Sequence, residues 1–319
     1  MGMDVLVVGG GGTIGSTVAY TLSVQDPETT VTLVDSDAET AEGHAIDVRH
    51  STRHVAHGLG RPDFGPEEPG TVRAAAASPS LAEAADCVVV TASAPRPEGG
   101  DARGGRLTFL ERNLEIADEI AGWLGEAAPT PVVVVSNPVD RITHRLYRRT
   151  GWPRRHFLGY SLSETARIAD EIARRTDSAP REVYCPIVGE HGEHVVPLFS
   201  RATVGGDPVE FSEAEREAIV EYVRDVPYDV LQLRGSRDSS RWVTARGVAT
   251  IVRRLDDGRA ETPACLSTPL DGEYGFEDVS LSVPVELDDD GVGEILEWDL
   301  TDEERAAFEA AYRAVKTDR

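Results

Sequence analysis

The sequence predicts an α/β protein, in which a parallel-sheet domain over residues 1–145 precedes an α+β domain over residues 146–319. Four short apolar runs mark the first domain: Val5–Val8, Val31–Val34, Cys87–Val90 and Val132–Val135. Parallel strands are buried on both faces, so they read as continuous runs of this kind. The segments between the runs are long enough for crossover helices, which is the pattern of βαβ units.

The second half of the sequence predicts a different pattern of helices and strands. Helices are expected at Ser163–Arg175, Glu213–Asp225, Trp242–Leu255 and Thr301–Lys316, a strand at Val183–Val188, and a β-rich segment at Leu270–Leu287. Thr301 and Glu304 have the spacing of a capping box at the start of the last helix. The Pro-, Gly- and acid-rich residues 60–70 predict a surface loop.

The charge balance is strongly acidic. There are 56 acidic and 32 basic residues, which gives a net charge of −24, and Lys316 is the single lysine. Such a surface repels nucleic acid and anionic membranes. The acid excess together with scarce lysine favours a protein that works in molar salt over an ordinary acidic soluble protein.

Cysteine usage and hydropathy indicate a cytoplasmic protein. Cys87, Cys185 and Cys265 are far apart and form no CxxC pattern, which is typical of a reducing compartment. The start of the chain does not resemble a signal peptide, and no apolar run approaches the ~20 residues that span a bilayer. We therefore expect neither membrane nor nucleic acid as a partner.

A glycine-rich segment, GGGGTIG, follows the first predicted strand and precedes a helix-like stretch. Its glycines fit both G-x-G-x-x-G and G-x-x-G-x-x-G. Glycine allows the sharp turn and the close approach of the backbone to a pyrophosphate, which then lies at the positive end of the helix. The segment predicts a Rossmann-type dinucleotide site formed by Gly9, Gly10, Gly12, Thr13, Ile14 and Gly15.

An acidic residue ends the second predicted strand. Asp35 lies 20 residues after Gly15, where a carboxylate binds both ribose hydroxyls. A carboxylate there repels a 2′-phosphate, so NAD is favoured over NADP. The alternative is that Asp35 only caps the strand.

Several further segments resemble the malate/lactate dehydrogenase family nearly end to end. They are VVGGGGTIG, LVDSDAETAEGHAIDVRH, VVVTASAPR, RLTFLERNLEIADEI, SNPVD, LSETARIADEIA, IVGEHGEHVVPLFS, WVTARGVA and LDGEYGFEDVSLSVPVEL. The likeness is greatest to the lactate-dehydrogenase-like malate dehydrogenases of haloarchaea. It implies NAD-dependent hydride transfer with a small 2-keto or 2-hydroxy acid, and a homodimer or homotetramer.

The family's catalytic histidine corresponds to His191 in GEHG, and His194 is the rival. A zinc site of His191, His194 and Cys185 is a further alternative, but it lacks a fourth ligand. The family's orienting aspartate corresponds to Glu164, three residues before the carboxylate-binding Arg167. Glutamate departs from the family, and the segment GYSLSETAR is one residue shorter than usual.

Two arginines of the substrate loop are assigned by the resemblance. Arg106 lies seven residues before Asn113 and corresponds to the residue that polarises the keto oxygen, with Arg103 as the weaker candidate. Arg96 in SAPR occupies the specificity position, where arginine pairs with the second carboxylate of oxaloacetate or malate. The loop between Arg96 and Arg106 is three residues longer than usual and holds four glycines.

The remaining site residues complete the expected pocket. Asn137 is expected at both substrate and cofactor, Asn113, Val135 and Ser136 along the cofactor, and Ser240 in the substrate pocket or as an ordinary helix residue. The predicted activity is that of a malate dehydrogenase of the tricarboxylic acid cycle, with no metal. The alternatives are a lactate or other 2-hydroxyacid dehydrogenase, and an NAD-binding paralogue with weakened catalysis.

Overall fold

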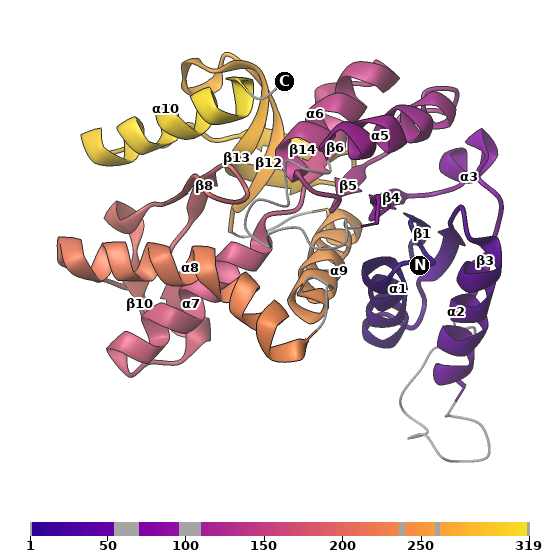
Figure 1. Cartoon of the computed structure of the whole chain (residues 1–319), viewed down its shortest axis with the longest axis horizontal. Helices are drawn as coiled ribbons and strands as arrows, with labels where there is room; N and C mark the ends of the chain where they lie inside the picture. The colour runs from indigo at the N-terminus through magenta and orange to yellow at the C-terminus, as the bar shows by residue number, and fades with distance from the viewer. Residues whose placement is uncertain (1, 54–69, 96–109, 236–239, 259–261, 318–319) are drawn as a thin grey trace.

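The computed structural model describes residues 2–53, 70–95, 110–235, 240–258 and 262–317. Figure 1 shows a mixed α/β molecule in which the N-terminal half lies beside a C-terminal half built on a long β-hairpin. Of the surface loop expected at residues 60–70, all but Gly70 lies outside the described residues.

The N-terminal half is the predicted parallel sheet. Its strands are β1 (Asp4–Val8), β2 (Thr30–Val34), β3 (Val72–Ala74), β4 (Cys87–Val90), β5 (Val132–Val134) and β6 (Phe157–Gly159). They lie in the order β3-β2-β1-β4-β5-β6, with every pair parallel. This is the doubly wound order of a dinucleotide-binding fold, so the predicted fold class is confirmed.

Helices cover both faces of that sheet. They are α1 (Thr13–Gln25), α2 (Ala38–Ser51), α3 (Pro79–Glu83), α5 (Leu110–Leu124) and α6 (Val139–Thr150). Alternate residues of β1 explain the unbroken apolar runs: Val5 and Val7 pack into one core cluster, and Leu6 and Val8 into another. Each such buried side chain contributes roughly 1.5–3 kcal/mol.

The same sheet continues into the C-terminal half with antiparallel strands. After β6 come β12 (Ala264–Asp271), β13 (Glu277–Asp288), β8 (Ile187–Gly189) and β9 (Val195–Pro197), and β14 (Gly291–Ile295) pairs with β13. The predicted boundary between residues 145 and 146 falls within α6, and it stays a prediction.

The single strand expected at Val183–Val188 is wrong. The segment forms two strands, β7 (Val183–Tyr184) and β8, which belong to different sheets. Pro186 lies between them and has no N–H to donate to a ladder, which explains the break. β7 pairs with β10 (Thr203–Val204), which pairs with β11 (Asp207–Pro208).

The helices expected in the second half are present with shifted ends. They are α7 (Leu162–Thr176), α8 (Glu213–Arg234), α9 (Arg241–Asp257) and α10 (Asp302–Thr317), with short 3₁₀ helices at Arg154–His156, Pro180–Glu182, Phe199–Arg201 and Glu273–Gly275. α8 continues through Pro227, well beyond its predicted end. The capping box of α10 is confirmed: the Thr301 N–H donates to Glu304 at 3.0 Å, and the Glu304 N–H donates to the Thr301 hydroxyl at 3.2 Å.

Two arrangements position the site. α9 packs against α1, so the C-terminal half meets the glycine-rich end of the parallel sheet (Figure 1). α6 packs on β12 and β13, close to where the chain leaves β5. In the described part of the chain, no helix is both long enough and apolar enough to cross a bilayer.

Candidate active site

His191 lies in a tight turn between β8 and β9, residues 190–194, which we name the catalytic loop. The turn requires glycine at residue 189, whose φ is +95° and where a Cβ would lie 2.6 Å from the carbonyl oxygen of His194. The Glu190 N–H closes the turn by donating to that same oxygen at 3.2 Å. The sheet therefore presents His191 from a rigid turn.

The first turn of α7 brings a carboxylate to this histidine. Glu164 Oε2 lies 2.8 Å from His191 Nδ1, and the two side chains are only 4% and 10% exposed. Arg167, one helical turn further, has Nη1 3.8 Å from Glu164 Oε1. Because the carboxylate faces Nδ1, Nε2 is the ring nitrogen left to exchange a proton with a substrate.

His194 faces a different acid. Its Nδ1 lies 2.6 Å from Glu190 Oε2, and its side chain is 44% exposed. Burial opposes ionisation of Glu190, but contacts from His194 and from the Arg141 guanidinium outweigh it and lower the pKa of the carboxyl group. Cys185, the third residue of the zinc alternative, is a buried thiol packed in an apolar cluster, and burial raises its pKa.

The glycine-rich turn lies where β1 adjoins both β2 and β4, the switch point of the sheet order. Gly9 has φ +94°, and Cβ atoms on Gly9 and Gly15 would clash with the Ala92 amide and with the Gly9 carbonyl. By contrast, a Cβ on Gly12 would meet only the Gly9 oxygen, at 3.3 Å, among the described atoms. Gly12 is also the N-cap of α1 and forms no side-chain cap. The backbone there is open to an anionic pyrophosphate, so the residues fit a dinucleotide.

Asp35 is held at the end of β2, beside this turn. Its Oδ2 accepts the Gly11 N–H at 2.9 Å and its Oδ1 accepts the Asp37 N–H at 2.9 Å. Two backbone amides thus fix the carboxylate next to the loop. Thr13 and Ile14 begin α1, and Ile14 packs against the core.

Asn113 joins two segments of the predicted site. Its Oδ1 accepts the Ala94 N–H at 2.7 Å, and its Nδ2 donates to the Asn137 carbonyl at 2.6 Å. Further contacts with the Ser93 hydroxyl use the remaining capacity of the amide. Asn113 therefore acts on the site by positioning the segments after β4 and β5, and its predicted contact with the cofactor stays a prediction.

The segment after β5 contains the other predicted contacts. The Val135 N–H donates to the Val90 carbonyl at 2.8 Å, and the buried Ser136 hydroxyl donates to the Ala92 carbonyl at 2.6 Å. The side-chain oxygen of Asn137 is buried, and no described group hydrogen-bonds to it. It is the polar atom of this segment left for a substrate or cofactor.

Ser240 is the N-cap of α9, and its carbonyl accepts the Thr244 hydroxyl at 2.7 Å. It is partly exposed, and its role in the pocket stays a prediction. Arg96, Arg103 and Arg106 lie outside the described residues.

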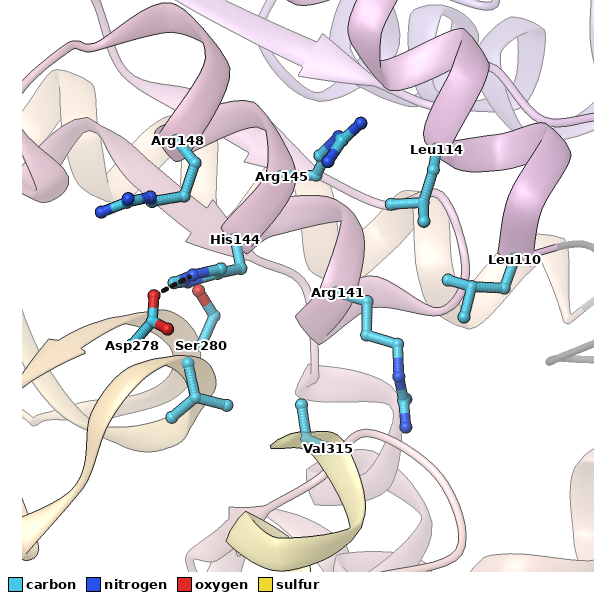
Figure 2. A pocket seen from close by; sticks show the side chains of 10 residues that line it. Leu110, Leu114, Arg141, His144, Arg145, Arg148, Asp278, Ser280 and Val315 are labelled. Atoms are coloured by element: carbon cyan, nitrogen blue, oxygen red, sulfur yellow. Dashed lines mark hydrogen bonds and ion pairs between the residues drawn. The ribbon is translucent and has the colours of Figure 1, made fainter. Parts of the chain in front are cut away.

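A cavity of about 310 Å³ lies between α5, α6, β13 and α10 (Figure 2). None of its described lining residues belongs to the predicted site. Two of its three arginines pair with acids, Arg141 with Glu190 and Arg145 with Asp118, and His144 faces Asp278. Because its described lining includes neither His191 nor Glu164, the cavity is separate from that pair of side chains.

Asp140 contacts His191, and the sequence motifs did not identify it as part of the site. Its buried carboxylate accepts the backbone N–H of His191 at 2.8 Å. The signal lay within the motif SNPVD, where an acid lies three residues after the predicted substrate residue Asn137, at the start of a helix that packs on the sheet. No sequence pattern placed it near His191.

The sheet order, the open glycine-rich turn and the buried acid–histidine pair are the features expected of a dinucleotide-dependent dehydrogenase. Family models agree along the chain. Residues 3–159 match the lactate/malate dehydrogenase NAD-binding domain, and residues 164–318 match the lactate/malate dehydrogenase alpha/beta C-terminal domain. The chain belongs to the lactate/malate dehydrogenase family, so it is an NAD-dependent oxidoreductase that acts on 2-hydroxy acids.

Relatives within the family carry both substrate names. The chain is 32% identical to an L-lactate dehydrogenase of Salinibacter ruber, over 97% of this chain and 95% of that one. It is 33% identical to a malate dehydrogenase of Halobacterium salinarum, over 96% and 95%. A lactate dehydrogenase structure from a deep-sea metagenome library superposes with a TM-score of 0.85 at 26% identity, covering 99% of this chain and 98% of that one.

Proposed function

We propose that the chain is a malate dehydrogenase, which interconverts (S)-malate and NAD with oxaloacetate, NADH and a proton. The observation that carries the chemistry is the pair of His191 Nδ1 and Glu164 Oε2 at 2.8 Å, with Arg167 beside it. This geometry also argues against a paralogue with weakened catalysis, because a decayed site has no reason to keep all three groups together.

His191 is the proton donor and acceptor. In the reduction, a bound NADH would be the source of the hydride for the keto carbon, while His191 Nε2 gives its proton to the keto oxygen. The Glu164 carboxylate beside Nδ1 stabilises the protonated ring before the transfer. In the oxidation, the neutral ring takes the hydroxyl proton back.

Arg167 binds the carboxylate next to the keto group, because a guanidinium can grip it through two parallel hydrogen bonds. Asn137 contacts the substrate through its side-chain amide, whose oxygen is buried without a described hydrogen bond, and Arg106 polarises the keto oxygen. The cofactor contacts are those of the glycine-rich turn with Asp35, and of Asn113, Val135, Ser136 and Asn137.

The choice of malate rests on Arg96, at the specificity position of the family pattern. A second cation there matches the distal carboxylate of a four-carbon dicarboxylate, which pyruvate and lactate lack. The malate-named relative supports this choice, and the lactate-named relatives keep lactate as the alternative. A malate dehydrogenase would serve the tricarboxylic acid cycle in the cytoplasm, as a homodimer or homotetramer.

The test is a steady-state comparison of oxaloacetate, pyruvate and larger 2-keto acids with NADH and NADPH in molar KCl. We expect oxaloacetate with NADH to have the highest kcat/KM. A charge-assisted pair is worth about 1.5–3 kcal/mol, so Arg96→Gln should cost oxaloacetate about 10–100-fold in kcat/KM and leave pyruvate unchanged or improved.

The matched control is Arg103→Gln, in the same loop. If Arg103→Gln shows the selective loss and Arg96→Gln does not, the specificity residue is Arg103. If neither variant changes the oxaloacetate-to-pyruvate ratio, the malate assignment is wrong. A wild-type preference for pyruvate would establish the lactate alternative.

A further inference from the structure

The first turn of α6 holds the catalytic loop through two consecutive side chains. The Asp140 carboxylate accepts the His191 N–H at 2.8 Å, and Arg141 Nη1 lies 3.1 Å from Glu190 Oε1. Arg141 also donates to the Ala314 carbonyl at 3.2 Å and extends toward the neighbouring Val315 of α10 (Figure 2). An acid and a base of one helix thus hold adjacent residues of the loop that carries His191.

Asp140 is an unusual choice for a purely structural acceptor. Its residue is 1% exposed, and its second oxygen, Oδ1, has no hydrogen bond within the described part of the chain. The Ser267 hydroxyl lies near enough to favour the ionised form but outside hydrogen-bonding geometry. A buried carboxylate held so sparsely is costly, whereas a neutral amide would accept the same N–H at less cost.

The surroundings show why the charge matters. Burial is the largest influence on Asp140 and, with repulsion from Glu190, raises the pKa of its carboxyl group to about 6 despite the opposing effects of Ser267 and His191. The charged groups that α5 and β13 direct toward α6 are engaged elsewhere, Asp118 with Arg145 and Asp278 with His144. Perturbed acids of this kind cluster at functional sites.

We propose that Asp140 is a positioning residue whose ionised carboxylate holds the backbone of His191 and so keeps the ring on Glu164. The proposal rests on the proposed function of His191. Asp140 touches neither the ring nor the predicted substrate residues in the contacts above, so it acts through the loop. The charge strengthens the bond, since hydrogen bonds to ionised acceptors are roughly twice as strong as neutral ones.

The kinetic test compares Asp140→Asn and Asp140→Ala with the wild type in the reduction of the 2-keto acid that the enzyme turns over best. Because near-ångström misplacement of a catalytic group costs up to ~100-fold, we expect kcat to fall about 10-fold in Asp140→Asn and about 100-fold in Asp140→Ala. KM should change little, since Arg167 on α7 binds the substrate carboxylate. Asp118→Asn is the matched control, the same change at an acid facing the same helix, and it should keep wild-type kcat.

The pH profile separates positioning from a merely structural role. The wild-type reduction rate should fall as the pH drops through about 6, where Asp140 takes up a proton. Asp140→Asn should lack that acid limb. An unchanged limb together with wild-type kcat in Asp140→Asn would overturn the proposal.

Two readouts do not depend on activity. The amide of His191 should exchange with deuterium faster in Asp140→Ala, with no change in α7, and equal protection would overturn the proposal.

Asp140→Asn should unfold at a temperature equal to or above that of the wild type at pH 8, because the buried charge is gone. A marked fall in the unfolding temperature of Asp140→Asn at pH 8 would overturn the proposal, because it would mean that Asp140 has only a structural role. If wild type turns over no 2-keto acid, the proposed function fails while the exchange result still decides the role of Asp140.

Discussion

The acid that faces His191 is longer by one methylene than the family's aspartate, and the segment before it is shorter by one residue. With both departures present, Glu164 still reaches His191 Nδ1 at 2.8 Å from the first turn of α7. The carboxylate also lies at the positive end of that helix, which favours its charge. The pair therefore depends on the length of this particular side chain.

Glu164→Asp should consequently lower activity, although it restores the family residue. Retracting the carboxylate by one methylene removes its contact with Nδ1, and we expect kcat to fall by about 10–100-fold. The control is Glu171→Asp on the same helix, where the acid pairs with Arg174 and Arg175 away from His191. A rise in kcat for Glu164→Asp would show that the glutamate impairs an ancestral site.

His191→Asn should abolish turnover and leave NADH binding nearly intact, because the ring supplies a proton and the predicted cofactor contacts lie elsewhere. Loss of a general acid and base costs about 10²–10⁴-fold. Steady-state rates and NADH fluorescence titrations measure the two effects. The matched control is His194→Asn, whose ring faces Glu190 and should keep substantial activity. Retention of more than a few per cent of activity in His191→Asn would transfer the role to His194.

At the level of elements, the predictable strands are those in which most residues are apolar, such as β1, β2, β4 and β5. The predicted β-rich segment, Leu270–Leu287, covers only the end of β12. Ser267 and Thr268 interrupt the apolar run of that strand, although both are buried. Pro186 divides a run that reads as one strand. α8 continues through Pro227 to Arg234, and its buried residues, Ile219 and Val223, both lie before the proline, so core burial does not explain the continuation.

The glycine-rich turn and Asp35, which local sequence predicts as cofactor contacts, lie side by side, since the Gly11 N–H donates to Asp35. Asp35→Ser should weaken NADH binding about 10-fold and relax the discrimination against NADPH, because the repulsive carboxylate is removed. Asp37→Ser is the control, since a serine still caps α2 and Asp37 is exposed. Fluorescence titration with both cofactors gives the ratio. An unchanged ratio would show that Asp35 does not contact the ribose.

At the scale of the whole molecule, the sequence motifs predict roles for His191 and Glu164 but not the contacts that hold them in place. The hydrogen bond that the His191 N–H donates to Asp140 joins residues 51 apart, and it exists only because α6 and the β8–β9 turn both pack on the β12–β13 hairpin. Family motifs name residues one at a time. A contact such as this one depends on the three-dimensional arrangement of elements, so motif reasoning passed over Asp140.

The net charge of −24 acts on the whole molecule as well. Two like charges ~10 Å apart in water repel by about 0.4 kcal/mol before screening, and an excess of this size involves many such pairs. Exposed ion pairs, such as Asp118 with Arg149, contribute only about 0–1 kcal/mol each. Repulsion between acidic residues therefore outweighs attraction within ion pairs across the surface. Salt screens both, so its net effect should be to stabilise the folded state.

Raising KCl from 0.1 to 2 M should accordingly raise the thermal unfolding midpoint by roughly 5–15 °C, since each kcal/mol shifts a chain of this size by about 2–4 °C. The shape of the curve identifies the cause. The Debye length falls from ~10 Å at 0.1 M to ~3 Å at 1 M, so screening predicts that most of the rise occurs below about 1 M. Exclusion of solutes from apolar surface would instead give a steady rise, as sucrose should. Full stability and activity without added salt would contradict the salt-adapted reading of the acidic surface.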